Sequence, residues 1–287
     1  MILITGASGN VGKEVLKQAA RTGQKVRAAY QSPQTAVPPV GVEAVDVDYN
    51  QSETLRAALE GVKKVFLVGP PTEQLVPLER KAIDVIAQTR VRHVVKLSAM
   101  GGRDAIFPRQ HAESEDYIRS VGIPYTFIRP NGFMQNLVNY SAPTIKATSE
   151  FFGSEGGGKI SQIDIRDIAA AAAKVLTEDG HIHKVYTLTG PEALSNNDVA
   201  RLLSEVLERG IRFVNLSPDQ LRTGLIAAGV PEWNADALID LQRLYREDKA
   251  AEITHDVENI LGRTPVSLRQ FLTEHRHAFE DAPQAGE

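Results

Sequence analysis

The sequence contains no cysteine among its 287 residues, which excludes disulfides, thiolate metal sites and cysteine nucleophiles. No run of residues approaches the roughly 20 apolar positions that a membrane-spanning helix needs. The chain also has no excess of positive charge, since its formal net charge is -4, so nucleic acids and anionic membranes are not expected partners. No basic and apolar export segment precedes the first predicted strand, and we therefore expect a cytoplasmic location.

The most informative motif lies in the first twelve residues. A short apolar run at 1–4 leads into Gly6, Gly9 and Gly12, and an amphipathic stretch follows at 13–20. This order predicts a strand, a tight turn and a helix whose N-terminus binds the diphosphate of a dinucleotide. The alternative is a tight turn in another kind of α/β protein. The predicted cofactor contacts of the turn are Gly6, Ser8, Gly9, Asn10, Val11 and Gly12.

Apolar runs and helical patterns alternate through the first half of the chain. The predicted strands lie at 1–4, 24–30, 41–49, 64–68, 92–98, 123–130 and 184–189. The predicted helices lie at 13–20, 52–59, 75–87, 110–120 and 167–176. This alternation predicts an α/β protein with a doubly wound parallel sheet.

Ligands of such sheets bind beyond the carboxyl ends of the strands, so residues at those ends are candidate contacts. Gln31 and Ser32 follow the second strand, and neither provides the acid that favours NAD or the arginine that favours NADP. The choice between NAD and NADP therefore stays open. Asp46 and Val47 are expected near the adenine, although Asp46 could equally be a turn residue. Gly69 and Pro70, after the fourth strand, are expected to border the cofactor.

The regular alternation ends after residue 130. A glycine-rich loop is expected at 151–158, and helices are expected at 195–207, 218–228, 234–245 and 266–279. We predict a cofactor-binding domain from 1–130 and 165–190, and a smaller α/β substrate-binding part from 131–164 and 191–280. Residues 281–287 form a polar tail.

Several motifs together resemble the NmrA-like, atypical short-chain dehydrogenase/reductase family, especially its bacterial NAD(P)H-dependent quinone oxidoreductases and triphenylmethane reductases. They lie at 6–12, 45–49, 111–115 with 122–126, 129–133 and 262–271. The resemblance spans nearly the whole chain. It implies a Rossmann domain that binds NADP or NAD, with a small C-terminal part closing a cleft over the nicotinamide. Many NADP-using members have an arginine where this chain has Gln31.

The resemblance also shows where the chain departs from typical short-chain dehydrogenases. Their Tyr-x-x-x-Lys frame reads Phe107 to His111 here, and a phenylalanine cannot donate a proton. The resemblance implies that His111 takes the place of the lysine and hydrogen-bonds the nicotinamide ribose or the acceptor oxygen; the alternative is an ordinary histidine at a helix start. Carbonyl reduction needs a nearby acid, whereas a conjugated acceptor spreads the charge that hydride brings.

Other site residues follow from position. Ser98 is a catalytic candidate at a strand end, although its hydroxyl could instead satisfy the local turn. Asn131 is expected to contact the cofactor, while Phe107, Phe133 and Met134 are expected on the substrate side. No metal is expected, because the pair of histidines at 181 and 183 has no third ligand near it in the sequence.

The leading hypothesis is an NAD(P)H-dependent oxidoreductase that transfers hydride to a quinone-like or other conjugated small molecule. The main alternative is a redox-sensing regulator that binds NAD(P) without turnover. A carbonyl reductase or sugar-nucleotide epimerase that uses Ser98 is a third hypothesis. Oligomeric state is left open between monomer and homodimer.

Overall fold

A computed structural model of the chain describes residues 1–31 and 36–280. Ser32 and the predicted tail at 281–287 lie outside the described residues. The chain divides into two compact units. Unit 1 comprises Met1–Pro130, Ile165–Leu188 and His255–Arg263, and unit 2 comprises Asn131–Asp164, Thr189–Thr254 and Thr264–Glu287.

Unit 1 is built on a seven-stranded sheet in the order β3-β2-β1-β4-β5-β6-β9, in which every neighbouring pair is parallel. This order confirms the predicted doubly wound α/β fold, since the chain starts in the middle of the sheet and winds outward in both directions. The strands are β1 (Ile2–Ile4), β2 (Val26–Tyr30), β3 (Glu43–Asp46), β4 (Lys64–Leu67), β5 (His93–Leu97), β6 (Tyr125–Pro130) and β9 (Lys184–Leu188).

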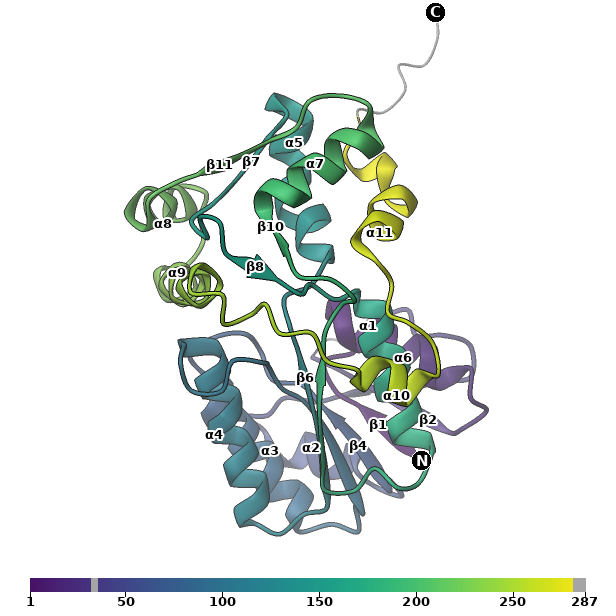
Figure 1. Ribbon diagram of the computed structural model, residues 1–287. Coiled ribbons are helices and arrows are strands. Elements are labelled where there is room, and N and C mark those ends of the chain that lie inside the picture. Colours follow the sequence, from purple (N-terminus) through teal and green to yellow (C-terminus); the bar gives the residue numbers. More distant parts are fainter. Residues whose placement is uncertain (32–35, 281–287) are drawn as a thin grey trace, which may run out of the picture. The chain divides into compact units, whose positions relative to one another are not determined.

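Helices cover both faces of this sheet, as Figure 1 shows. One layer contains α1 (Asn10–Ala20), α6 (Ile165–Thr177) and α10 (Asp256–Leu261), and the other contains α2 (Ser52–Ala58), α3 (Leu75–Ala87) and α4 (Ile106–Ser120). Because both faces are covered, the central strands are mostly apolar and buried, and their side chains form the core. In the layer of α2 and α3, buried residues such as Leu67, Ile83 and Phe127 pack together.

Helix α4 begins four residues earlier than the sequence pattern indicated. It starts at Ile106, so Pro108 lies in its first turn rather than before it. A proline is tolerated there, because the first N–H groups of a helix have no partner within the helix. His111 therefore lies in the second turn of α4 and is not a helix-start residue.

Unit 2 has two small strand pairs and several helices. Its strands are β7 (Glu150–Gly153) with β11 (Arg212–Asn215), and β8 (Lys159–Ile160) with β10 (Leu194–Ser195). Its helices are the π-helix η2 (Leu137–Ser141), α5 (Ala142–Thr148), α7 (Asn196–Leu207), α8 (Pro218–Ala227), α9 (Glu232–Arg246), α11 (Leu268–Glu274) and the 3-10 helix η3 (Arg276–Ala278). None of the helices within 1–31 and 36–280 is long and apolar enough to cross a membrane.

Two predictions for this unit were wrong. The expected loop at 151–158 begins as strand β7, because Phe151 is buried against Phe213 of β11 and the two backbones pair in parallel. The expected helix at 266–279 is divided into α11 and η3. Its start is set by Ser267, whose side chain accepts a hydrogen bond from the backbone N–H of Gln270.

Candidate active site

The turn between β1 and α1 has the form that the glycine spacing predicts. Gly6 has a φ of +61°, a conformation that favours glycine, and its carbonyl accepts a hydrogen bond from the N–H of Gly9 at 3.0 Å. A Cβ on Gly12 would lie 2.7 Å from the carbonyl carbon of Gly6 and still closer to its oxygen. Glycine at position 12 therefore lets α1 pack directly on the turn, as predicted.

The same turn presents backbone donors. The N–H of Lys13 makes a 2.9 Å bond to the carbonyl of Gly9, the residue that precedes α1. The amides of Asn10, Val11 and Gly12 come before this bond and therefore have no partner within the helix. No side chain caps this end of α1, and Ser8, Gly9 and Asn10 are exposed. The start of α1 thus offers free N–H groups and a partial positive charge, the chemistry that binds a diphosphate.

The other predicted cofactor contacts lie at neighbouring strand ends. Gln31 follows β2 and is exposed, and Asp46 is the last residue of β3 and is also exposed. Val47 is 6% exposed, and its N–H continues the pairing of β3 with β2 through a 2.9 Å bond to Tyr30. The carboxyl ends of β1, β2, β3 and β4 are adjacent in the sheet, so these residues lie along one edge of unit 1.

Gly69, two residues after β4, has a packing role that the sequence did not reveal. A Cβ at this position would lie 2.8 Å from Oε1 of Glu79 on α3. Glycine at position 69 therefore makes room for a carboxylate beneath the end of β4. Pro70 follows it and is half-buried.

Glu79 forms a buried ion pair with Lys96 of β5. The Lys96 ammonium donates to Oε2 and Oε1 of Glu79 at 2.6 and 2.7 Å, and both side chains are 0% exposed. It also donates to the carbonyl of Leu97 at 3.2 Å. Two charges removed from water are tolerated in this way only when each remains paired and hydrogen-bonded.

His111 lies against this pair. Its Nδ1 is 3.3 Å from Nζ of Lys96, and its side chain is half-buried. Burial, and secondly the positive charge of Lys96, hold the pKa of His111 well below its usual value. The ring is therefore neutral at physiological pH, and it can serve as a hydrogen-bond donor or acceptor without bringing a charge.

A second cluster at the end of β5 surrounds Glu115, one helical turn after His111. Ser98 donates to Oε1 of Glu115 at 2.6 Å, Arg129 of β6 donates to both carboxylate oxygens, and Glu115 is 1% exposed. Hydrogen bonding to Glu115 raises the pKa of Arg129. Glu115 thus ties α4 to β5 and β6, in keeping with the orienting role expected for it.

This cluster includes Ser98, the predicted catalytic residue at the end of β5. Its hydroxyl is 4% exposed and donates its hydrogen to Glu115 rather than to its own turn. The Ser98 oxygen keeps its capacity to accept a hydrogen bond, and its catalytic role stays a prediction.

Three predicted residues fall in unit 2. Asn131 is 6% exposed, and its amide donates to Oγ of Ser161 and to the carbonyl of Ala250, both at 2.8 Å. Its side chain therefore holds a loop together, and its cofactor contact stays a prediction. Met134 is 0% exposed in the core of unit 2, and its substrate contact likewise stays a prediction. Phe133 is half-buried and stays a candidate.

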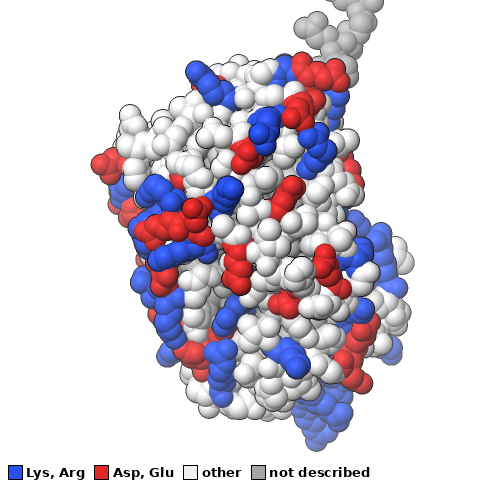
Figure 2. Space-filling model, viewed as in Figure 1, with Lys and Arg blue, Asp and Glu red and all other residues white. Residues whose placement is uncertain are grey.

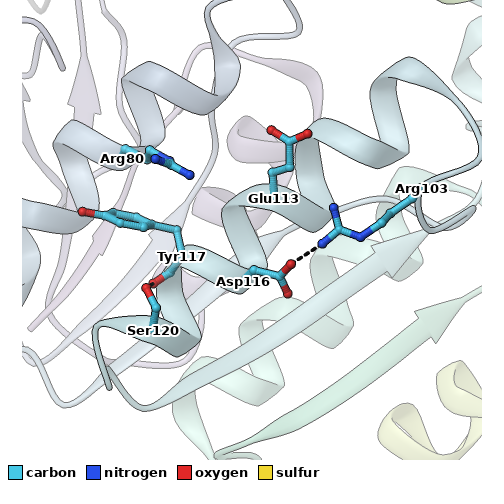
Figure 3. A pocket seen from close by; sticks show the side chains of 6 residues that line it. All are labelled: Arg80, Arg103, Glu113, Asp116, Tyr117 and Ser120. Atoms are coloured by element: carbon cyan, nitrogen blue, oxygen red, sulfur yellow. Dashed lines mark hydrogen bonds and ion pairs between the residues drawn. The ribbon is translucent and has the colours of Figure 1, made fainter.

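A surface hollow between α3 and α4 contains none of the predicted site residues (Figure 3). Arg103 forms an ion pair with Asp116 there, and the guanidinium of Arg80 lies 4.7 Å from the ring centroid of Tyr117. On the face shown in Figure 2, acidic and basic side chains are likewise mixed. Exposed pairs of this kind contribute little to stability, so we place no function in this hollow.

The glycine turn, the parallel sheet and the His111 helix all lie within one stretch that matches a known family. The model of the NmrA-like family matches residues 1–273. The chain belongs to the NmrA-like family.

Several relatives of this NmrA-like chain are named reductases or oxidoreductases. It is 34% identical to the NAD(P)H azoreductase of Xenophilus azovorans, over 97% of this chain and 99% of that protein. It is 30% identical to quinone oxidoreductase 2 of Escherichia coli, over 95% of this chain and 98% of that protein. The structure of an NADPH-dependent quinone oxidoreductase from Escherichia coli in complex with NADPH matches with a TM-score of 0.88 and 27% identity, over 96% of this chain and 100% of that one.

Sequence reasoning missed Lys96 and Glu79, although the sequence of this NmrA-like chain contains a signal for both. Lys96 interrupts an apolar strand whose neighbours are buried on both faces. Glu79 falls on the buried face of α3, four residues after Leu75 and four before Ile83. A single charge at each of two buried positions in neighbouring elements points to a pair, because neither charge could be buried alone.

Proposed function

We propose that this chain is an NAD(P)H-dependent oxidoreductase that passes hydride to a quinone-like or other conjugated small-molecule acceptor. The observation that carries the proposal is the β1–α1 turn, where Gly12 lies so close to Gly6 that no side chain fits and the first amides of α1 have no partner within the helix. This arrangement suits a diphosphate. The reductase relatives support the same assignment.

In this proposal the residues of unit 1 have separate roles in binding the cofactor and the acceptor. The amides of 10–12 bind the diphosphate, and Gln31, Asp46, Val47, Gly69 and Pro70 border the rest of the cofactor along the strand ends. A bound reduced nicotinamide supplies the hydride. His111 hydrogen-bonds an oxygen of the ribose or of the acceptor. NADP and NAD are both compatible with the neutral Gln31.

Phe107 and Phe133 are proposed to contact the acceptor. A phenyl ring aligns a flat conjugated molecule by packing, and it supplies no proton. When a quinone accepts hydride, the added charge spreads over its ring and the proton comes from water. Because water supplies the proton, an enzyme of this kind functions without a tyrosine at position 107.

A steady-state assay of NADH and NADPH oxidation against a panel of quinones and azo dyes tests the proposal. We expect turnover with several conjugated acceptors and little with simple ketones. Cofactor binding without oxidation by any acceptor would contradict the proposal and would favour a sensing role. The control is Gly12→Ala, which should weaken cofactor binding and turnover together.

We also propose a small-molecule partner rather than a nucleic acid, in a cytoplasmic protein that acts as a monomer or homodimer. The net charge of -4 supports the first point, since nucleic-acid affinity depends on positive charge. Salt-sensitive retention on DNA would contradict it. Light scattering of the purified chain distinguishes monomer from homodimer.

A further inference from the structure

The two ring nitrogens of His111 have different surroundings. Nδ1 lies 3.3 Å from Nζ of Lys96. Within the described ranges 1–31 and 36–280, Nε2 has no hydrogen-bond partner. The proton of a neutral imidazole occupies one of these two nitrogens, and its location decides whether the ring donates or accepts toward a ligand at Nε2.

The contacts of Lys96 determine which ring nitrogen of His111 carries the proton. Its ammonium is bonded to both oxygens of Glu79 at 2.6 and 2.7 Å, with both side chains 0% exposed, so the lysine is present as a cation. A lysine ammonium has three donors and no acceptor, and here they are shared among both Glu79 oxygens, the Leu97 carbonyl and Nδ1 of His111. A hydrogen on Nδ1 would face this cation at 3.3 Å with nothing to accept it, so the ring proton lies on Nε2.

We propose that Lys96, held in place by Glu79, fixes His111 as the neutral tautomer with its hydrogen on Nε2, so that the ring presents one N–H donor to an oxygen of a bound ligand. Lys96 and Glu79 are thus positioning residues. The identity of the ligand oxygen, a ribose hydroxyl or an acceptor carbonyl, rests on the proposed function, whereas the tautomer does not.

The charged form of His111 is disfavoured from every side. Lys96 repels a second cation at Nδ1, and the half-buried position gives a charged ring little solvation. On the same helix, Glu115 is bonded to Ser98 and Arg129. Asp116, also on this helix, is paired with Arg103 and Arg119. Glu79 is paired with Lys96.

The direct test is a two-bond proton–nitrogen NMR spectrum of the cofactor-free, full-length chain with ¹⁵N-labelled histidine rings at pH 7.5. The chain has seven histidines, and the His111 signals are those lost in His111→Asn. We expect the pattern of a neutral ring protonated on Nε2. A ring protonated on Nδ1, or on both nitrogens, would overturn the proposal. The pattern is read from the unaltered protein, and the variant serves only to assign the His111 signals.

A double variant tests whether the ion pair is the cause. Glu79→Met with Lys96→Met removes both charges and keeps the volume, a replacement that buried pairs tolerate. The His111 signals should then move to an average of the two tautomers. The control is Asp167→Asn with Arg263→Met, which removes an ion pair between a buried aspartate of α6 and an arginine that is 49% exposed, and it should leave the signals unchanged. An unchanged His111 pattern in the Glu79/Lys96 variant would refute the role of the pair.

Binding and turnover show which oxygen the donor meets. His111→Ala should weaken the interaction about three- to tenfold, the effect of one hydrogen bond. The Glu79/Lys96 double variant should weaken it about twofold, because about half of the rings keep the hydrogen on Nε2. The triple variant should lose no more than His111→Ala alone. Weaker NADPH binding indicates the ribose, and a raised acceptor KM with unchanged cofactor binding indicates the acceptor. Losses that multiply in the triple variant would contradict an action through His111. Absence of turnover with every acceptor would defeat the proposed function but leave the NMR result standing.

Discussion

Two regions at the same edge of one sheet are built in opposite ways: the turn after β1, and the charged cluster of Glu79, Lys96 and His111. The turn consists of backbone atoms from seven consecutive residues, Gly6 to Gly12, and its function depends on the absence of side chains. The cluster consists of side chains from α3, β5 and α4, far apart in the sequence, and its function depends on their charges. The first is a local structure, and the second exists only after the sheet has formed.

This difference predicts how each region responds to substitution. A change in the turn should act mainly on cofactor binding, through the position of the amides. A change in the cluster should act first on folding, because a charge left unpaired in the interior is costly. The following variants test that contrast, from the largest expected effect to the smallest.

Lys96→Met should be the most damaging single change. It leaves the Glu79 carboxylate, which is 0% exposed, without its cation, and breaking a buried pair in this way costs about 3–5 kcal/mol of unfolding free energy. Urea denaturation measures the loss. The comparison is the Glu79→Met/Lys96→Met double variant, which should recover most of it. A single variant as stable as the double would mean that the two charges are not coupled.

Gly12→Ala should distort the turn. The added Cβ would lie 2.7 Å from the carbonyl carbon of Gly6, so α1 must shift, at about 1–3 kcal/mol of stability. Calorimetric titration with NADPH should show a larger proportional loss in cofactor affinity than in acceptor KM. Gly157→Ala is the matched control, since nothing lies within 4 Å of its added Cβ. Unchanged NADPH affinity in Gly12→Ala would remove the turn from the binding site.

Glu115→Ala should cost less than Lys96→Met. It leaves the buried hydroxyl of Ser98 without its acceptor, but Arg129 is 32% exposed and can be solvated. We expect about 1–3 kcal/mol in thermal or urea unfolding. Glu115→Gln should lose less, because its amide oxygen still accepts from Ser98. Equal losses in both variants would mean that the negative charge, rather than the bond to Ser98, is what matters.

Gln31→Arg should leave stability unchanged and alter only cofactor preference. Position 31 is exposed at the end of β2, and a guanidinium there can pair with the 2′-phosphate of NADPH. A charge-assisted bond of about 1.5 kcal/mol would shift the NADPH/NADH affinity ratio about tenfold. Paired titrations with both cofactors measure the ratio. An unchanged ratio would place the adenosine ribose elsewhere.

The contrast also explains what could be predicted from the sequence. The glycine spacing at 6, 9 and 12 describes contacts within a few residues, so the turn, the first helix and the parallel sheet were all predictable. Lys96 and Glu79 are separated by 17 residues, and their pairing requires knowledge of which faces of α3 and β5 meet. The bond from Ser98 to Glu115 was not predictable for the same reason, since these residues, at the end of β5 and on α4, are also 17 residues apart.

The errors in unit 2 have a related origin. Strand β7 pairs with β11, which lies about sixty residues later, and neither shows the regular strand–helix alternation of unit 1. Met134 was expected on the substrate side, and no local pattern indicated that its side chain packs into the core of unit 2. Local patterns do not record such long-range packing.

The absence of a side chain at Gly69 has a consequence for engineering. A methyl group at position 69 would clash with the Glu79 carboxylate. Randomising this residue to widen the acceptor range would therefore disturb His111 through Glu79 and Lys96. A change in acceptor selectivity could then not be distinguished from an effect of misfolding. A library aimed at new dyes should keep Gly69 fixed and vary Phe107 and Phe133 instead.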